Sequence, residues 1–212
     1  MSSQPENHLN FDQPLMPRTR VALFLLIVPV LLSYVFPIWQ IRLKAPQYPD
    51  GLKMDIYSYK IEGGNGGQDI NEINELNHYI GMRKLDRSQF SDLDWIPFAF
   101  GILILLTLRQ AVLGDLRGLI DLVVLTTYVS LFAFARYVYR LYVFGHDLDP
   151  HAAVKIPPFM PVVFGEKQLA NFTTFGMPQV GTFLLAVFAG GILLLSVLEL
   201  RNARRLTALA AA

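Results

Sequence analysis

The 212-residue sequence contains no cysteine. Without thiols the chain cannot form a disulfide, a cysteine-ligated zinc site, an iron–sulfur cluster or a thiolate nucleophile. It also has no excess of charge of one sign, because 18 Lys and Arg stand against 17 Asp and Glu, for a formal net charge of +1. Binding to nucleic acid usually requires a basic patch, so we exclude nucleic acid as a partner.

Motifs typical of an enzyme are missing as well. No catalytic nucleophile, carboxylate pair or phosphate-binding loop stands out, and the stretch GGNGG at 63–67 lacks the lysine that a P-loop needs. We therefore expect a protein that is not an enzyme. Any metal would have to be bound by His, Met, carboxylate or backbone oxygen.

Long apolar runs, in contrast, are abundant, and 53% of the residues are hydrophobic. Runs near 21–39, 95–113, 119–144 and 179–200 each approach the roughly 20 residues that a helix needs to cross a bilayer. The sequence predicts an all-α membrane protein with four transmembrane helices in the lipid bilayer. Four spans place both ends of the chain on one side of the membrane.

Arginines near the ends of these runs predict which side that is. Six of them flank short segments: Arg18, Arg20, Arg117, Arg201, Arg204 and Arg205. Positive charge in short segments favours the cytoplasm, whereas long loops cross regardless of their charge. We expect residues 1–17 to be a disordered cytoplasmic tail, 201–212 a basic cytoplasmic tail, and loops 40–94 and 145–178 to lie outside.

The first outer loop is too long for a connection without structure, so we expect the two loops to form a small α+β cap. The stretch LKMDIYSYKI at 52–61 is typical of a strand or hairpin. A helix is predicted over 69–81, with Asp69 as N-cap, Glu72 completing a capping box and Gly81 at the exit. Its buried stripe would consist of Ile70, Ile73, Leu76 and Ile80.

Histidine and methionine are concentrated in the outer loops. His78 and Met82 are predicted to lie opposite the buried stripe of that helix, which suggests a pair of metal ligands. Thioether and imidazole groups suit copper, particularly Cu(I). The candidate ligands are His78, Met82, His146, Met54, Asp147 and His151. The alternative is that Met82 packs against a membrane helix and His78 makes an ordinary hydrogen bond.

The second outer loop opens with GHDLDP, whose Asp147 and Asp149 are placed where a turn could gather ligands, although both residues are also ordinary loop formers. Arg136 and Arg140 share one face of the third span near its outer end, where charge is costly unless it is paired. They could pair with Asp147 or Asp149. They could equally act as anchors among the tyrosines of the membrane interface.

Four stretches carry a resemblance to a known family: APQYPDGL at 45–52, INELNHYIGM at 73–82, GHDLDPHAAVKIP at 145–157 and KQLANF at 167–172. They resemble bacterial multi-span membrane proteins encoded beside nitrous oxide reductase, an enzyme of denitrification, and its copper maturation factors. The resemblance covers roughly residues 20–200, and LNHYIGM together with GHDLDP is its most specific part. His78, Met82 and His146 lie in the stretches that match best, whereas His151 and Met160 lie where the pattern differs.

The resemblance implies a place in the bacterial inner membrane and a role near copper delivery to, or electron supply for, a periplasmic copper enzyme. We expect a non-enzymatic accessory protein with a His/Met copper site outside the membrane, partnered by a copper chaperone or copper enzyme such as nitrous oxide reductase. The two outer loops would fold over each other and bring His78 and His146 into one cap. The alternatives are a membrane electron-transfer subunit that binds haem or quinone, and a structural scaffold for a membrane complex.

Overall fold

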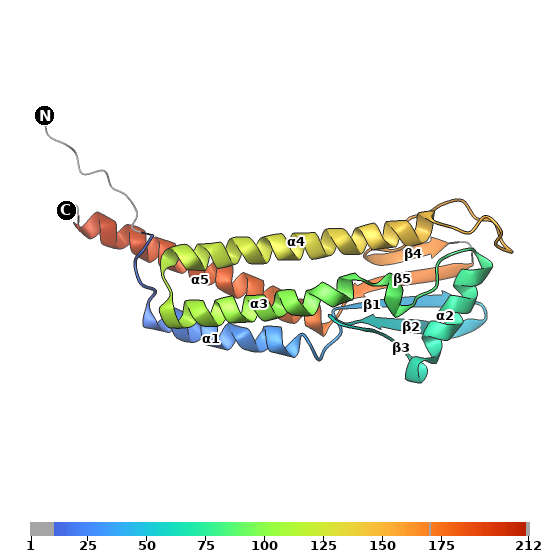
Figure 1. Ribbon diagram of the computed structural model, residues 1–212, viewed down its shortest axis with the longest axis horizontal. Coiled ribbons are helices and arrows are strands. Elements are labelled where there is room, and N and C mark those ends of the chain that lie inside the picture. The colour runs from blue at the N-terminus through green and yellow to red at the C-terminus, as the bar shows by residue number, and fades with distance from the viewer. Residues whose placement is uncertain (1–10, 170, 211–212) are drawn as a thin grey trace, which may run out of the picture.

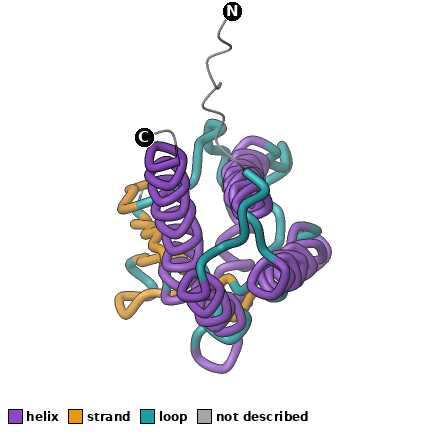
Figure 2. Tube along the Cα trace, turned by 90° about the vertical axis from the view of Figure 1, so that its left-hand side faces the viewer, coloured by secondary structure: helices purple, strands orange, loops and turns teal. Residues whose placement is uncertain are grey.

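Four helices run side by side along the long axis of the molecule, and a five-stranded antiparallel sheet lies at one end of them (Figure 1). The computed structural model describes residues 11–169 and 171–210. The helices are α1 (Pro17–Leu32), α3 (Asp92–Leu113), α4 (Leu116–His146) and α5 (Val180–Ala210). Both α1 and α4 pack against α3 and α5. Figure 2 looks along these helices from the end away from the sheet.

Three of these helices, α3, α4 and α5, are long and apolar enough to cross a membrane. The protein is thus mostly helical, with a small antiparallel sheet, as expected of a multi-pass membrane protein with a cap. The remaining helix, α1, has 16 residues and ends at Leu32 rather than near Trp39. Pro37 disfavours helical backbone at Phe36, so the chain turns there, and Trp39 is the first residue of a strand.

The sheet has the order β3-β2-β1-β5-β4 and contains strands from both long loops, 40–94 and 145–178. Loop one supplies β1 (Trp39–Ala45), β2 (Tyr48–Ile56) and β3 (Ile61–Gly63), and loop two supplies β4 (Gly165–Leu169) and β5 (Phe172–Pro178). The predicted hairpin around 52–61 is confirmed by the pairing of β2 with β3. The antiparallel pairing of β1 with β5 confirms that the two loops fold together.

Helix α2 (Gln68–Tyr79) packs on the sheet through its predicted stripe, since Ile73 is buried against Leu52 and Met54. The predicted N-cap is wrong, because Gly67 precedes the helix and Asp69 lies inside its first turn. The buried Asp69 carboxylate instead accepts hydrogen bonds from the Lys53 backbone N–H at 2.8 Å and from Asn65 Nδ2 at 2.7 Å. It ties the start of α2 to β2 and to the preceding turn.

The end of α2 is confirmed at Gly81, which has a φ of +76°. The Met82 N–H donates to the Asn77 carbonyl at 2.8 Å and the Gly81 N–H to the His78 carbonyl at 3.3 Å, the pattern of a Schellman motif. Loop two lies directly on this turn, because the Asp149 N–H donates to the Gly81 carbonyl at 2.8 Å. The turn therefore joins the two long loops a second time.

Replacing Gly81 by Ala should destabilise the protein more than the same change at Gly66. Both glycines have positive φ, which costs an L-residue about 1–2 kcal/mol. A Cβ at Gly81 would also lie 2.8 Å from the Asp149 carbonyl oxygen, whereas a Cβ at Gly66 would meet nothing within 4 Å. Thermal unfolding of the two variants in detergent should show the larger drop for Gly81→Ala, and equal drops would contradict the close contact with loop two.

Candidate functional site

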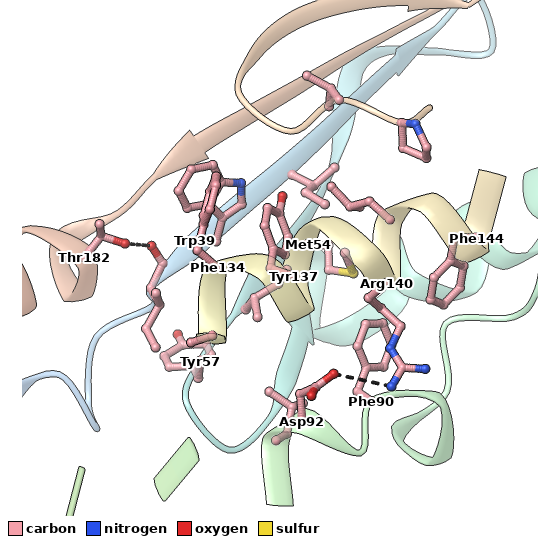
Figure 3. A pocket seen from close by; sticks show the side chains of 18 of the residues that line it. Trp39, Met54, Tyr57, Phe90, Asp92, Phe134, Tyr137, Arg140, Phe144 and Thr182 are labelled. Carbon is pink, nitrogen blue, oxygen red and sulfur yellow. Dashed lines mark hydrogen bonds and ion pairs between the residues drawn. The ribbon is translucent and has the colours of Figure 1, made fainter. Parts of the chain in front are cut away.

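A cavity of about 520 Å³ lies where the helix bundle meets the cap (Figure 3). We call it the chamber. Its volume is within the roughly 300–1,000 Å³ of pockets that hold small molecules. Its membrane end is lined by residues of α3, α4 and α5, and its cap end by one face of the sheet, by α2 and by the segment 159–162.

The chamber wall is almost entirely apolar. The membrane end presents Phe100 and Leu103 from α3, Val129 from α4 and Phe188 from α5. Alternate residues of a strand share one face, and the sheet accordingly presents the side chains Ile41, Leu43, Met54, Ile56 and Phe172. Such a surface favours an apolar occupant over water or a hydrated ion.

Only three charged residues line the chamber among those described, and two of them form an ion pair. The Asp92 carboxylate at the start of α3 accepts from Arg140 Nη2 at 3.3 Å and from Arg136 Nε at 2.8 Å (Figure 3 shows Asp92 and Arg140). The third is Lys167 of β4, whose Nζ donates to the Met160 carbonyl at 2.6 Å. Asp92 thus holds together the ends of α3 and α4 that lie nearest the sheet.

The predicted pairing of Arg136 and Arg140 with Asp147 or Asp149 is therefore wrong. Asp147 instead forms an ion pair with Arg83, and Asp149 accepts from the His151 backbone N–H at 2.8 Å. Asp92 lies at the first turn of α3, beside the last turns of α4, and this position brings its carboxylate within hydrogen-bonding distance of both guanidinium groups. Arg136 also lies over the Tyr139 ring, with 5.7 Å from Cζ to the ring centroid.

Three polar atoms of residues that line the chamber are buried without a hydrogen-bond partner in the described part of the chain. They are Trp39 Nε1, Tyr137 Oη and Arg140 Nε. The Trp39 and Tyr137 rings lie together, with 5.4 Å between their centroids. A buried donor without a partner lowers the stability of the folded protein. These three atoms therefore indicate a place where a ligand with hydrogen-bond acceptors would stabilise it.

The structure separates the proposed ligands His78 and Met82. Met82 lines the chamber together with Ile73, Leu76 and Ile80, so the prediction that it lies on the opposite side from this stripe is wrong. The left-handed turn at Gly81 ends the helix before Met82, which therefore does not follow the helical spacing. His78 does remain on the polar side, in a small depression lined by Asn71, Asn74, Glu75 and Lys84.

The other predicted metal ligands lie outside the chamber, apart from Met54, which lines it. His146 stacks on Tyr142, with 3.8 Å between ring centroids, and its Nδ1 lies 2.9 Å from the Tyr142 carbonyl oxygen. Among the described residues no three His, Asp or Glu side chains are grouped so as to hold a metal ion.

His78, Asp149 and His151 are nevertheless neighbours at the surface. The pKa of Asp149 is lowered mainly by the backbone N–H of His151, then by the His151 ring, whose Nδ1 lies 3.3 Å from Asp149 Oδ1, and by the charge of His78. Burial opposes this shift only in part. The His151 ring contacts this carboxylate and is 91% exposed, whereas no hydrogen bond or ion pair joins His78 to it among the described residues.

Sequence reasoning missed the residues that shape the chamber. Asp92 opens an apolar run in SDLDWIPF, where a carboxylate indicates a helix start but not its arginine partners. The sequence places Trp39 at the end of a predicted membrane span and Tyr137 among the tyrosines expected at the membrane interface. The alternation of apolar and polar residues in WQIRLKA at 39–45 is the signal that could have revealed β1.

No protein-family model matches the sequence, and comparison with curated proteins and with solved structures finds no similar protein.

Replacing Asp92 by Asn should lower the free energy of unfolding by about 2 kcal/mol, because two arginines lose the charge that they share. Asp94→Asn is the matched control in the same helical turn. Asp94 is 68% exposed and pairs with Arg87 at the surface, so its loss should cost less than about 1 kcal/mol. Chemical unfolding in detergent measures both, and equal losses would show that the Asp92 cluster does not hold α3 to α4.

Proposed function

We propose that this protein is a non-enzymatic membrane protein that binds an apolar molecule in the chamber. The observation that carries the proposal is the chamber itself, an apolar cavity bounded by three membrane helices on one side and by a sheet on the other. An apolar molecule dissolved in the bilayer already lies at the depth of its membrane end. Binding there removes apolar surface from contact with water and lipid headgroups at the membrane boundary.

The composition of the wall favours some occupants over others. None of the described histidines lines the chamber, so the wall offers no imidazole to ligate a haem iron. A lipid or a quinone-like molecule requires only apolar contacts and a few hydrogen-bond donors, which the wall provides. The protein would store, present or pass on such a molecule as an accessory factor.

We further propose that all four helices cross the bacterial inner membrane, with both termini in the cytoplasm and the cap outside. Helix α1 packs along α3 and α5, and its 16 residues span about 24 Å. Exposed Val35 and Phe36 extend its apolar surface. The arginine-rich start of α1 and end of α5 lie at the end of the bundle away from the sheet, in agreement with the rule for positive charge.

Filling the chamber should expel its occupant. Ala189 of α5 lines the chamber, whereas Val187 of the same helix is 57% exposed and faces away from it. We expect Ala189→Phe to lose most of the apolar molecule that remains bound through purification, while Val187→Phe keeps it. Native mass spectrometry and solvent extraction measure the bound molecule per mole of protein, with thermal unfolding as the control for folding.

Two results would contradict this function. The first is a wild-type protein that carries only the detergent used to purify it. The second is a bound molecule whose amount is the same in wild type, Ala189→Phe and Val187→Phe.

A second candidate function is supported by the thioethers of the chamber. Met54, Met82 and Met160 all line it, and thioethers in an apolar, cysteine-free site suit Cu(I). The resemblance to proteins encoded beside nitrous oxide reductase favours the same metal. In this role the protein would assist assembly of a periplasmic copper enzyme, or its supply with copper, in contact with that enzyme or with a copper chaperone.

The copper function predicts that Met82→Leu lowers Cu(I) affinity while His78→Ala leaves it unchanged, because Met82 lines the chamber and His78 does not. Leucine keeps most of the apolar volume, so folding should survive. Met177→Leu is the matched control, since Met177 is 54% exposed on β5 and does not line the chamber. Titration against a competing Cu(I) chelator is the measurement.

A loss in His78→Ala alone would move the copper site to the surface pair His78 and His151. Equal affinity in wild type and all three variants would contradict both copper sites.

A further inference from the structure

The chamber has a polar end and an apolar end. All three charged residues of its described wall lie toward the cap: Asp92 at the start of α3, Arg140 near the end of α4, and Lys167 on β4. The membrane end, formed by the middle of α3, α4 and α5, presents Phe100, Leu103 and Phe188 and no charge. This order matches an amphiphile, which has a polar head and an apolar tail.

The polar end carries more positive than negative charge. One carboxylate, Asp92, is shared by the two guanidinium groups of Arg136 and Arg140. Lys167 donates to a backbone carbonyl, and no carboxylate of the described residues pairs with it. The exposed ammonium group of Lys167 and the two arginines that share one carboxylate give this end of the chamber a net positive charge, which attracts an anionic partner.

The Arg140 side chain is held by its hydrogen bonds, and the backbone of Lys167 is held by the sheet. Arg140 donates to Ser91 Oγ at 3.0 Å as well as to Asp92, and its Nε remains without a partner in the described chain. Lys167 pairs with Thr174 in the sheet, and Thr174 Oγ1 donates to the Lys167 carbonyl at 3.0 Å. One cation comes from a helix and the other from the sheet, so the polar end is built from two walls of the chamber.

We propose that the chamber binds an anionic amphiphile, with a carboxylate or phosphate head near Arg140 and Lys167 and an acyl tail along Phe100, Leu103 and Phe188. The proposal rests on the proposed binding function and adds the chemical class of the ligand. With the cap outside the membrane, the head would point outward, which is the orientation of a lipid in the outer leaflet. A free fatty acid and an anionic phospholipid share this chemistry.

Head-group recognition is tested with three probes of equal chain length: hexadecanoate, hexadecyl phosphate and hexadecanol. Binding to the purified full-length protein in a neutral detergent is measured by native mass spectrometry and calorimetry at pH 7.5, where the carboxylate is ionised. We expect both anions to bind about tenfold more tightly than the alcohol, the size of one charge-assisted hydrogen bond.

Two variants and one control assign the cations. Lys167→Gln and Arg140→Gln should each weaken binding of both anions about tenfold and leave hexadecanol unchanged. Lys155→Gln, at an exposed position of loop two outside the chamber, should change nothing. If Arg140→Gln also loses hexadecanol and thermal stability, Arg140 serves folding and the Lys167→Gln result decides the proposal.

Failure of the anionic-head proposal can be distinguished from failure of the proposed binding function. Equal affinity for all three probes in the wild type would overturn the anionic head and leave the apolar chamber standing. No binding of any probe would overturn the chamber function as well. The mass of the molecule retained from native membranes separates a fatty acid from an anionic phospholipid, and a neutral molecule there, such as a quinone, would overturn the proposal.

Discussion

The pairing of β1 with β5 is the interaction on which the rest of the structure depends. Strand β1 follows α1 after a short turn, and β5 leads directly into α5, so a ladder between these two strands also sets α1 beside α5. The ladder continues to the helix junction, where the Gln179 N–H donates to the Ile38 carbonyl and the Gly181 N–H to the Pro37 carbonyl, both at 2.9 Å. A Cβ at Gly181 would lie 2.8 Å from that Pro37 oxygen, so glycine permits this close approach.

The chamber exists because the two ends of the bundle are closed differently. At the end away from the sheet, Glu199 is 1% exposed and accepts from the Met16 N–H at 3.0 Å, and Arg20 binds the Val112 carbonyl at 3.0 Å. Leu119 and Ile192 fill the space between the helices there. At the other end the helices are covered by a sheet rather than by one another, and the space between the two layers is the cavity.

This arrangement places chemistry of two kinds next to each other. The membrane end of the chamber is apolar and is formed by the middle of the helices. The charged residues of its wall lie toward the cap, on the helix ends and the sheet. The carboxylate of Asp92 pairs with two arginines at the boundary between these parts, so one negative charge there faces two positive ones. Met82 lines the same chamber and adds a thioether to its wall.

The sequence by itself determined the features that depend on near neighbours in the chain. Apolar runs of sufficient length predict α3, α4 and α5, because a helix satisfies its own backbone hydrogen bonds within an apolar segment. The stripe of α2 and its exit at Gly81 follow from helical spacing and from the conformational freedom of glycine. The tertiary structure alone decided which distant groups come together. It pairs β1 with β5, it pairs the two arginines with Asp92 and not with Asp147, and it places Met82 in the wall of the chamber. The chamber itself also exists only in the folded chain. A strand or a charge can pair with many segments of suitable composition, and only the packing of the whole chain determines which of them comes within hydrogen-bonding distance.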